Sequence, residues 1–176
     1  PLGRPVFHAS AVLTATGHAV AFMGNTGMGK STLASALYRA GCQVLSDDAL
    51  LIEMKNKDSV LTGTAAYHSL RLWEDSIDYL FPEQQKFARI PGTQGKQQWV
   101  PKHGKEVNSA PLSALFLLGN PDESVGHEQL DIKPASGSVA IMSLVESLFA
   151  LDVRDRGLIK ENFSRAGRLA RSRTAI

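Results

Sequence analysis

The sequence predicts an α/β domain with a mixed sheet flanked by helices. A glycine-rich loop at residues 24–31 lies between a short apolar run of strand type and an apolar-patterned helix. A second apolar run precedes that strand and is joined to it by a short turn, and two helical segments close the chain. A strand hairpin that leads into such a loop favours a mixed sheet over an all-parallel one.

The loop reads Gly24-Asn25-Thr26-Gly27-Met28-Gly29-Lys30-Ser31 and matches the phosphate-binding pattern G-x-x-x-x-G-K-[ST]. Glycines let the backbone turn tightly and come close to an anion. Lys30 supplies a cation for the β/γ-phosphates, and the Ser31 hydroxyl is suited to Mg²⁺. The helix that follows favours a phosphate at its N-terminus, so Thr32 in its first turn is included among the nucleotide-binding residues. We expect ATP and Mg²⁺ as ligands.

The first half of the chain alternates apolar runs with turn residues. Runs at His8–Leu13 and His18–Met23, separated by Thr14–Gly17, predict an antiparallel hairpin. The following elements are predicted in this order: a helix from Ser31 to Ala40 closed by Gly41, a strand from Gln43 to Leu45, a strand from Ala49 to Met54, a turn at 55–58, a short strand at 59–62, and a helix from Leu70 to Phe81 that Pro82 stops.

The second half is less regular. Residues 82–108 are polar and glycine-containing, which predicts a mobile loop with a short strand near Gln98–Val100. A buried strand at Leu112–Leu118, a loop at 119–127, a strand at Leu130–Lys133 and helices at about Ser138–Leu151 and Arg156–Arg171 complete the prediction.

Composition limits the class of protein. The chain of 176 residues is one domain in length, 43% hydrophobic and 20% charged, with no run as long as a membrane span and no secretory signal. A net charge of +2 gives no argument for nucleic acid. The single cysteine, Cys42, suits a reducing cytoplasm. Residues 1–3 resemble the scar of a cleaved expression tag, so the domain is assigned to residues 4–176, which is compatible with a piece of a longer protein.

Asp47 and Asp48 follow the strand after the phosphate-loop helix. If that helix packs on the sheet, this strand runs beside the loop strand and its end lies next to the loop. Adjacent carboxylates on an extended backbone face opposite sides. One can then face the metal and nucleotide, while the other takes a proton from an attacking hydroxyl. The alternative is a strand-end turn with two solvated acids; the loop upstream favours the functional interpretation.

Three further features are candidates. His8 either has a structural role or helps the site by orienting an aspartate or touching a phosphate. Arg71, beside Trp73, is either a stacked guanidinium near the site or a surface residue; we favour the site because a transferring phosphoryl group needs a cation beyond Lys30. The last helix carries an apolar stripe (Leu158, Ile159, Phe163, Ala166 and Leu169) and a basic face that is either solvated or a docking surface for an acidic peptide or another subunit.

His8, the hairpin, the loop and Leu45-Ser46-Asp47-Asp48-Ala49 together resemble the catalytic domain of the HPr kinase/phosphorylase family. Leu130–Pro134 and the helix after it fall where that family has a basic-Pro segment and a helix. Tyr67-His68-Ser69-Leu70-Arg71-Leu72-Trp73 is similar to a segment of smaller HPr-kinase-like proteins, some of which phosphorylate lasso-peptide precursors. The resemblance implies a fold like that of phosphoenolpyruvate carboxykinase and phosphoryl transfer from ATP to a serine hydroxyl.

By position, the resemblance implies that Lys30 binds phosphate, Ser31 binds Mg²⁺, Asp48 accepts the proton, Asp47 supports the metal and His8 assists. The family's metal-binding glutamate falls near Ser69, so that ligand is missing or supplied by Glu74 or Asp75. The family's later arginine has no clear match; the candidates are Arg71, Lys102, Lys105 and Lys133. HPr kinases form ring oligomers, which leaves a homo-oligomer open here.

These observations predict a Mg-ATP-dependent kinase whose partner is a protein or peptide with an acceptor serine. Neither nucleic acid nor a membrane is an expected partner. Two alternatives stay open. A small-molecule kinase acting on an amino acid or another metabolite also places acids one strand after the loop, although such enzymes usually add an arginine-rich lid. A nucleotide-sensing module would bind ATP without chemistry.

Overall fold

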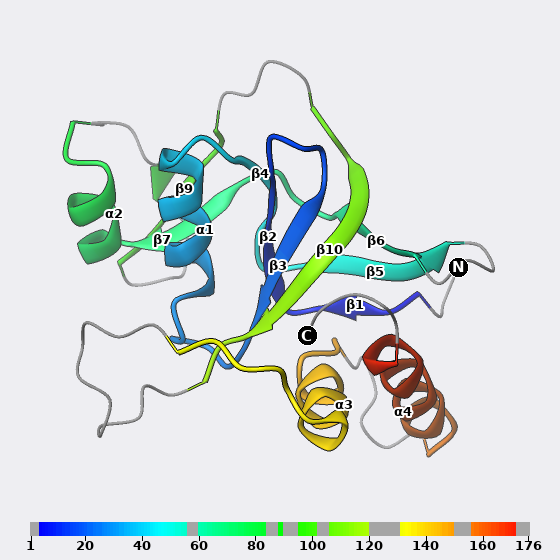
Figure 1. Cartoon of the computed structure of the whole chain (residues 1–176). Helices are drawn as coiled ribbons and strands as arrows, with labels where there is room; N and C mark the ends of the chain where they lie inside the picture. Colours follow the sequence, from blue (N-terminus) through cyan, green and yellow to red (C-terminus); the bar gives the residue numbers. More distant parts are fainter. Residues whose placement is uncertain are drawn as a thin grey trace.

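The computed structural model describes residues 4–55, 60–83, 88–89, 95–101, 106–119, 131–149 and 156–171. The strands are β1 (Val6–Phe7), β2 (Ala9–Leu13), β3 (Ala19–Met23), β4 (Gln43–Ser46), β5 (Leu50–Lys55), β6 (Val60–Ala65), β7 (Leu70–Trp73), β8 (Ala88–Arg89), β9 (Lys96–Trp99) and β10 (Ser109–Leu117). The helices are α1 (Lys30–Arg39), α2 (Glu74–Leu80), α3 (Gly137–Glu146) and α4 (Arg156–Ala170) (Figure 1).

The larger sheet is mixed and curled, with the strand order β1-β5-β6-β10-β3-β2-β4. β1 lies at one edge and β2 next to the other edge, yet a single residue, His8, separates them in the chain. Likewise, three residues (47–49) connect the edge strand β4 to β5 near the opposite edge. Such short connections require the two edges to approach each other. The junction residues His8, Asp47 and Asp48 therefore meet at one place.

The predicted hairpin is confirmed. β2 pairs antiparallel with β3, with Leu13 opposite Ala19 and Ala9 opposite Met23, while β10 runs parallel to β3. Every residue of β2 is buried because the strand alternates between two cores. Ala9, Ala11 and Leu13 belong to the core inside the curled sheet, and Val12 packs in the core under α1. The hairpin therefore lies within the fold, and it leads directly to the loop before α1.

The strand after α1 is not beside the loop strand as predicted. β4 pairs with β2, so the hairpin strand lies between β4 and β3. Both predicted strands adjoining residues 47–49 form, and the prediction of a short strand at 59–62 falls within the longer β6, apart from residue 59. The predicted turn at 55–58 lies outside the described residues beyond Lys55.

The prediction of a helix over residues 70–81 is wrong at its start. Leu70–Trp73 form strand β7, and only Glu74–Leu80 form the helix α2. Leu70 and Leu72 are buried in the core under α1, whereas Arg71 and Trp73 face the other way. This alternation has the period of a strand, and β7 pairs with β9 in a second sheet of order β7-β9-β8. The described parts of residues 82–108 thus contribute strands rather than only a loop.

The two C-terminal helices are confirmed, but α3 ends at Glu146, so the part of its prediction at residues 147–149 is wrong. The strand predicted at 130–133 is wrong for its described part. Residues 131–133 have no regular structure and are exposed. α3 and α4 pack together near β1 (Figure 1). Ala166 and Leu169 of the predicted α4 stripe are buried, but Ile159 and Phe163 are 40% and 43% exposed. No helix in the described part of the chain is both long and apolar enough to cross a membrane.

Candidate active site

The loop between β3 and α1 has a backbone that depends on glycine. Gly24, Gly27 and Gly29 have φ values of 146°, 90° and 82°, a region that L side chains avoid. Gly29 is the N-cap of α1. A Cβ atom added at Gly24 would lie 2.8 Å from the carbonyl oxygen of Leu118. The glycines of the motif therefore have a structural reason in this fold, independent of any ligand.

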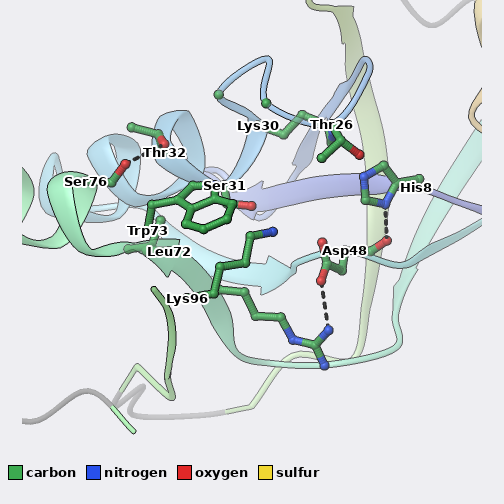
Figure 2. Close-up of a pocket in the computed structure, with 13 residues that line it drawn as sticks. His8, Thr26, Lys30, Ser31, Thr32, Asp48, Leu72, Trp73, Ser76 and Lys96 are labelled. Carbon is green, nitrogen blue, oxygen red and sulfur yellow. Dashed lines mark hydrogen bonds and ion pairs between the residues drawn. The ribbon is translucent and has the colours of Figure 1, made fainter. Parts of the chain in front are cut away.

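A cavity of about 210 Å³ opens beside this loop. On its phosphate-loop side it is lined by Thr26, Gly27 and Gly29–Thr32, together with His8 and Asp48. The β7–β9 side consists of Arg71, Leu72, Trp73 and Lys96, and Ser76 lines the cavity beside Thr32 (Figure 2). Gly24, Asn25 and Met28 shape the loop but do not line the cavity; the amide of Met28 donates to the carbonyl of Asn25 at 3.2 Å.

Asp47 is held behind the loop by three hydrogen bonds. Its Oδ1 accepts from the hydroxyls of Ser10 (2.5 Å) and Ser31 (2.8 Å), and its Oδ2 accepts from the backbone N–H of Arg71 (2.8 Å). Only 1% of the residue is exposed. The carboxylate thus joins the hairpin, the first turn of α1 and strand β7.

Burial raises the pKa of Asp47 above its ordinary value of 3.8. The hydrogen bonds from Ser10, Arg71 and Ser31 act in the opposite direction, while the negative charge of Asp48 raises the pKa further. A cation next to Ser31 would favour the ionised carboxylate. A positively charged ligand beside Asp47 would therefore stabilise the ionised form of its carboxylate.

The donor atoms fit Mg²⁺. The Ser31 hydroxyl and the Asp47 carboxylate are hard oxygen ligands joined at 2.8 Å, and in phosphate-loop proteins such a pair holds the metal. The described residues contain no group of three or more His, Cys, Asp or Glu side chains that could form a metal cage. Mg²⁺ commonly binds one or two protein oxygens and completes its shell with phosphate oxygens and water, so the Ser31 and Asp47 oxygens would be enough to hold it.

Asp48 does not continue the strand, which corrects the extended backbone predicted for the acid pair. Its φ is 66°, in the left-handed region, because the chain turns here from β4 towards β5. The Ser46 hydroxyl closes the turn by donating to the carbonyl of Ala49 at 2.6 Å. The two carboxylates still point to different places: Asp47 lies behind the loop, and Asp48 lines the cavity.

His8 contacts Asp48 directly. The Nδ1 atom of His8 donates to the backbone carbonyl of Asp48 at 3.1 Å, since that oxygen can only accept. The amide of His8 donates to the carbonyl of Ser147 at 2.6 Å, and its ring lies edge-on to Phe149. His8 therefore connects the end of α3 to the left-handed turn at Asp48.

Lys30 is turned towards its own loop. Its Nζ donates to the carbonyls of Gly24 (2.7 Å) and Asn25 (2.9 Å), and the residue is 6% exposed. Burial lowers the pKa of Lys30; the charges of Asp48 and Asp47 oppose this effect, and the charge of Lys96 adds to it. The carbonyl contacts are the ones that a bound phosphate would replace.

The β7–β9 side differs in detail from the sequence prediction. Arg71 lines the cavity and forms an ion pair with Asp48 at 2.9 Å, but its guanidinium lies over Tyr67 rather than Trp73. Trp73 instead lies under the ammonium group of Lys96, 5.1 Å from the ring centre. Sequence reasoning missed Lys96, because nothing in Lys96-Gln97-Gln98-Trp99 distinguishes it from a lysine on any surface strand.

Lys133, Glu74, Asp75 and Ser69, which were further candidates, do not line the cavity. Lys133 is exposed and paired with Asp131 at 2.6 Å. Glu74 and Asp75 are exposed in the first turn of α2. Ser69, where the metal-binding glutamate was expected by resemblance, is buried and accepts from the Gln98 side-chain amide at 2.9 Å. Lys102 and Lys105 lie outside the described residues.

Comparison with known proteins finds a likeness at the level of structure. No protein-family model matches the chain, and no curated protein matches it significantly. The solved structure of the Hpr(Ser) kinase/phosphatase from Coxiella burnetii is similar, with a TM-score of 0.46 and 17% sequence identity over 93% of this chain and 96% of that one. A likeness at this level says nothing about individual site residues.

Proposed function

We propose that this protein is a Mg-ATP-dependent kinase that transfers the γ-phosphoryl group to a serine hydroxyl of a protein or peptide. The hydrogen bond of 2.8 Å between Ser31 and Asp47 carries the proposal. It joins the last residue of the phosphate loop to a buried carboxylate, while the next residue, Asp48, faces the same cavity. A metal-binding pair and a separate acid are the two parts that phosphoryl transfer to a hydroxyl requires.

The phosphate loop is the proposed site of the ATP phosphates. Lys30 would exchange its contacts with the carbonyls of Gly24 and Asn25 for the β/γ-phosphates. Ser31 and Asp47 would hold Mg²⁺, which supplies charge neutralisation for the phosphate oxygens. Thr32 lines the cavity in the first turn of α1 and shares a hydrogen bond of 3.2 Å with Ser76. Its position next to the phosphate loop fits a contact with the bound nucleotide.

Asp48 is the proposed proton acceptor. The serine hydroxyl gives its proton to the Asp48 carboxylate as its oxygen bonds to the γ-phosphorus. The bond between that phosphorus and the oxygen bridging to the β-phosphate breaks, and ADP leaves with the electron pair. His8 positions Asp48 through its backbone carbonyl. Arg71, already paired with Asp48, would offer its charge to the phosphoryl group as well.

The acceptor is proposed to be a protein or peptide on the strength of the motif resemblance of His8, the loop and the acid pair. A lasso-peptide precursor is the first peptide to try, because the segment Tyr67–Trp73 is similar to kinases of such precursors. Arg71 and Trp73 within that segment line the cavity, and Tyr67 lies beneath the guanidinium of Arg71. Part of the segment that carries this resemblance therefore lines the cavity of the proposed reaction.

A mass-spectrometric screen tests the proposal. Candidate serine-containing peptides, free amino acids and sugars are incubated with Mg-ATP and searched for an added phosphate, with Lys30→Ala as the matched control. Phosphate on a peptide serine that disappears with Lys30→Ala supports the proposal. Transfer only to a small molecule would identify a metabolite kinase instead. Nucleotide binding in calorimetry without transfer to any acceptor would identify a nucleotide-sensing module.

A further inference from the structure

Three cationic side chains converge on the cavity, and they differ in what balances their charge. Lys30 is near both Asp48 and Asp47, and Arg71 forms an ion pair with Asp48. Within the described part of the chain, Lys96 forms no ion pair; its ammonium group lies over the ring of Trp73. Lys96 is therefore the cation of this site whose charge is left for a ligand.

The pairing of β7 with β9 fixes the backbone position of Lys96. In the antiparallel pair of β7 and β9, Lys96 lies directly opposite Trp73. The preceding residue, Gly95, has a φ of 81°, and a Cβ atom added to it would lie 3.6 Å from the Trp73 ring. The carbonyl of Gly95 also accepts from the amide of Glu74 at 3.2 Å. Figure 2 shows the Lys96 side chain extending from this anchored point into the cavity.

In this arrangement Lys96 and Lys30 repel each other, although Asp48 and Asp47 attract Lys30 more strongly. Burial is the main cause that lowers the pKa of Lys30, and the positive charge of Lys96 lowers it further, so the two lysines repel each other. A polyphosphate placed between them would turn this repulsion into two attractions. The contact of Lys96 with a partly exposed ring is weaker than a charge-assisted hydrogen bond to phosphate, so the ring would release it.

We propose that Lys96 is a second phosphate-binding residue, which contacts the terminal phosphoryl group of the bound donor. This inference rests on the proposed function, because it takes the phosphates to be held by the loop. Lys96 comes from the β7–β9 side, together with Arg71, which contacts Asp48. The phosphoryl group that meets an acceptor at Asp48 is the terminal one, so a cation on this side contacts that group.

Calorimetry with Lys96→Met tests the inference. The affinities for Mg-ATP and Mg-ADP are measured on the whole chain, with Lys133→Met as the matched control, since Lys133 is an exposed lysine outside the cavity. We expect Lys96→Met to bind ATP at least about tenfold more weakly than the unchanged protein, the size of one charge-assisted hydrogen bond, and to bind ADP almost as before. Lys133→Met should change neither affinity.

Two further measurements keep the result decisive. Lys96→Arg should retain the preference for ATP over ADP, and thermal unfolding should show all variants to be folded. Unchanged ATP affinity in Lys96→Met, or equal losses for ATP and ADP, would overturn the role of Lys96 while leaving the proposed function intact. If the unchanged protein binds neither ATP nor ADP and so does not differ from Lys30→Ala, the proposed function fails, and this inference fails with it.

Discussion

The two sides of the candidate site are built in different ways. On the phosphate-loop side, Asp47 is 1% and Lys30 is 6% exposed, and each makes its hydrogen bonds within the protein. On the β7–β9 side, the contacts are a partly exposed ion pair of Arg71 and a cation–π contact between Lys96 and Trp73, which is 49% exposed. The phosphate-loop side is thus a buried hydrogen-bond network, whereas the β7–β9 side consists of long side chains with few contacts.

This difference separates what preserves the fold from what responds to a ligand. A buried polar group left without its partner is costly, so the hydrogen bonds of Asp47 with Ser10, Ser31 and the Arg71 amide hold before any ligand arrives. Exposed pairs contribute little and rearrange easily. Substitution of Asp47 should therefore affect folding, whereas substitutions on the β7–β9 side should affect binding and turnover. Asp48, on the phosphate-loop side, is joined to the β7–β9 side by its ion pair with Arg71.

The largest effect is expected for Asp48→Asn. Asparagine tolerates the left-handed backbone but cannot take the proton, so the transfer rate should fall by about 10² to 10⁴. Calorimetric affinity for Mg-ATP should stay close to that of the unchanged protein. Undiminished turnover in a single-turnover assay would remove Asp48 from the mechanism.

The next largest effect should be the destabilisation caused by Asp47→Ala. The Ser10 and Ser31 hydroxyls and the Arg71 amide would lose their acceptor, which should lower the free energy of unfolding by about 2 to 3 kcal/mol in urea titrations. Asp47→Asn keeps one acceptor oxygen and should lose less. Equal stability of Asp47→Ala and the unchanged protein would contradict the buried network.

A smaller loss of stability is expected for Gly24→Ala. The added Cβ would meet the Leu118 carbonyl at 2.8 Å in a backbone with positive φ, which should destabilise the protein by about 2 kcal/mol. Gly27→Ala is the control, because it has positive φ but open space, and it should cost about 1 kcal/mol. Thermal unfolding of both variants measures the difference; a reversed order would show that the contact with Leu118 does not shape the loop.

Arg71→Gln should change stability least. Its ion pair with Asp48 has side chains 36% and 25% exposed, so the free energy of unfolding should fall by less than about 1 kcal/mol. The backbone N–H of residue 71 would still donate to Asp47, and added salt should reduce the difference between the two proteins. A loss as large as that of Asp47→Ala would remove the contrast between the two sides.

The elements that could be predicted from the sequence are those with strong local signals. The glycine loop, the hairpin before it and the helix after it follow from contiguous residues, and the structure has them where they were expected. Asp47 was predicted to lie near the loop, and its hydrogen bond to Ser31 places it there. The strand order differs from the prediction, since β2 lies between β4 and β3. The turn at 47–49 nevertheless lies beside the loop.

By itself, the sequence determined the phosphate-loop side, because a tight loop and its flanking elements are specified by neighbouring residues. Only the tertiary structure decided the β7–β9 side. Trp73 and Lys96 are partners because two strands more than twenty positions apart pair in one register, and no local pattern encodes that pairing. The left-handed turn at Asp48 was likewise set by the need to connect the two edges of a curled sheet. Long-range pairing thus brought Lys96 to the cavity.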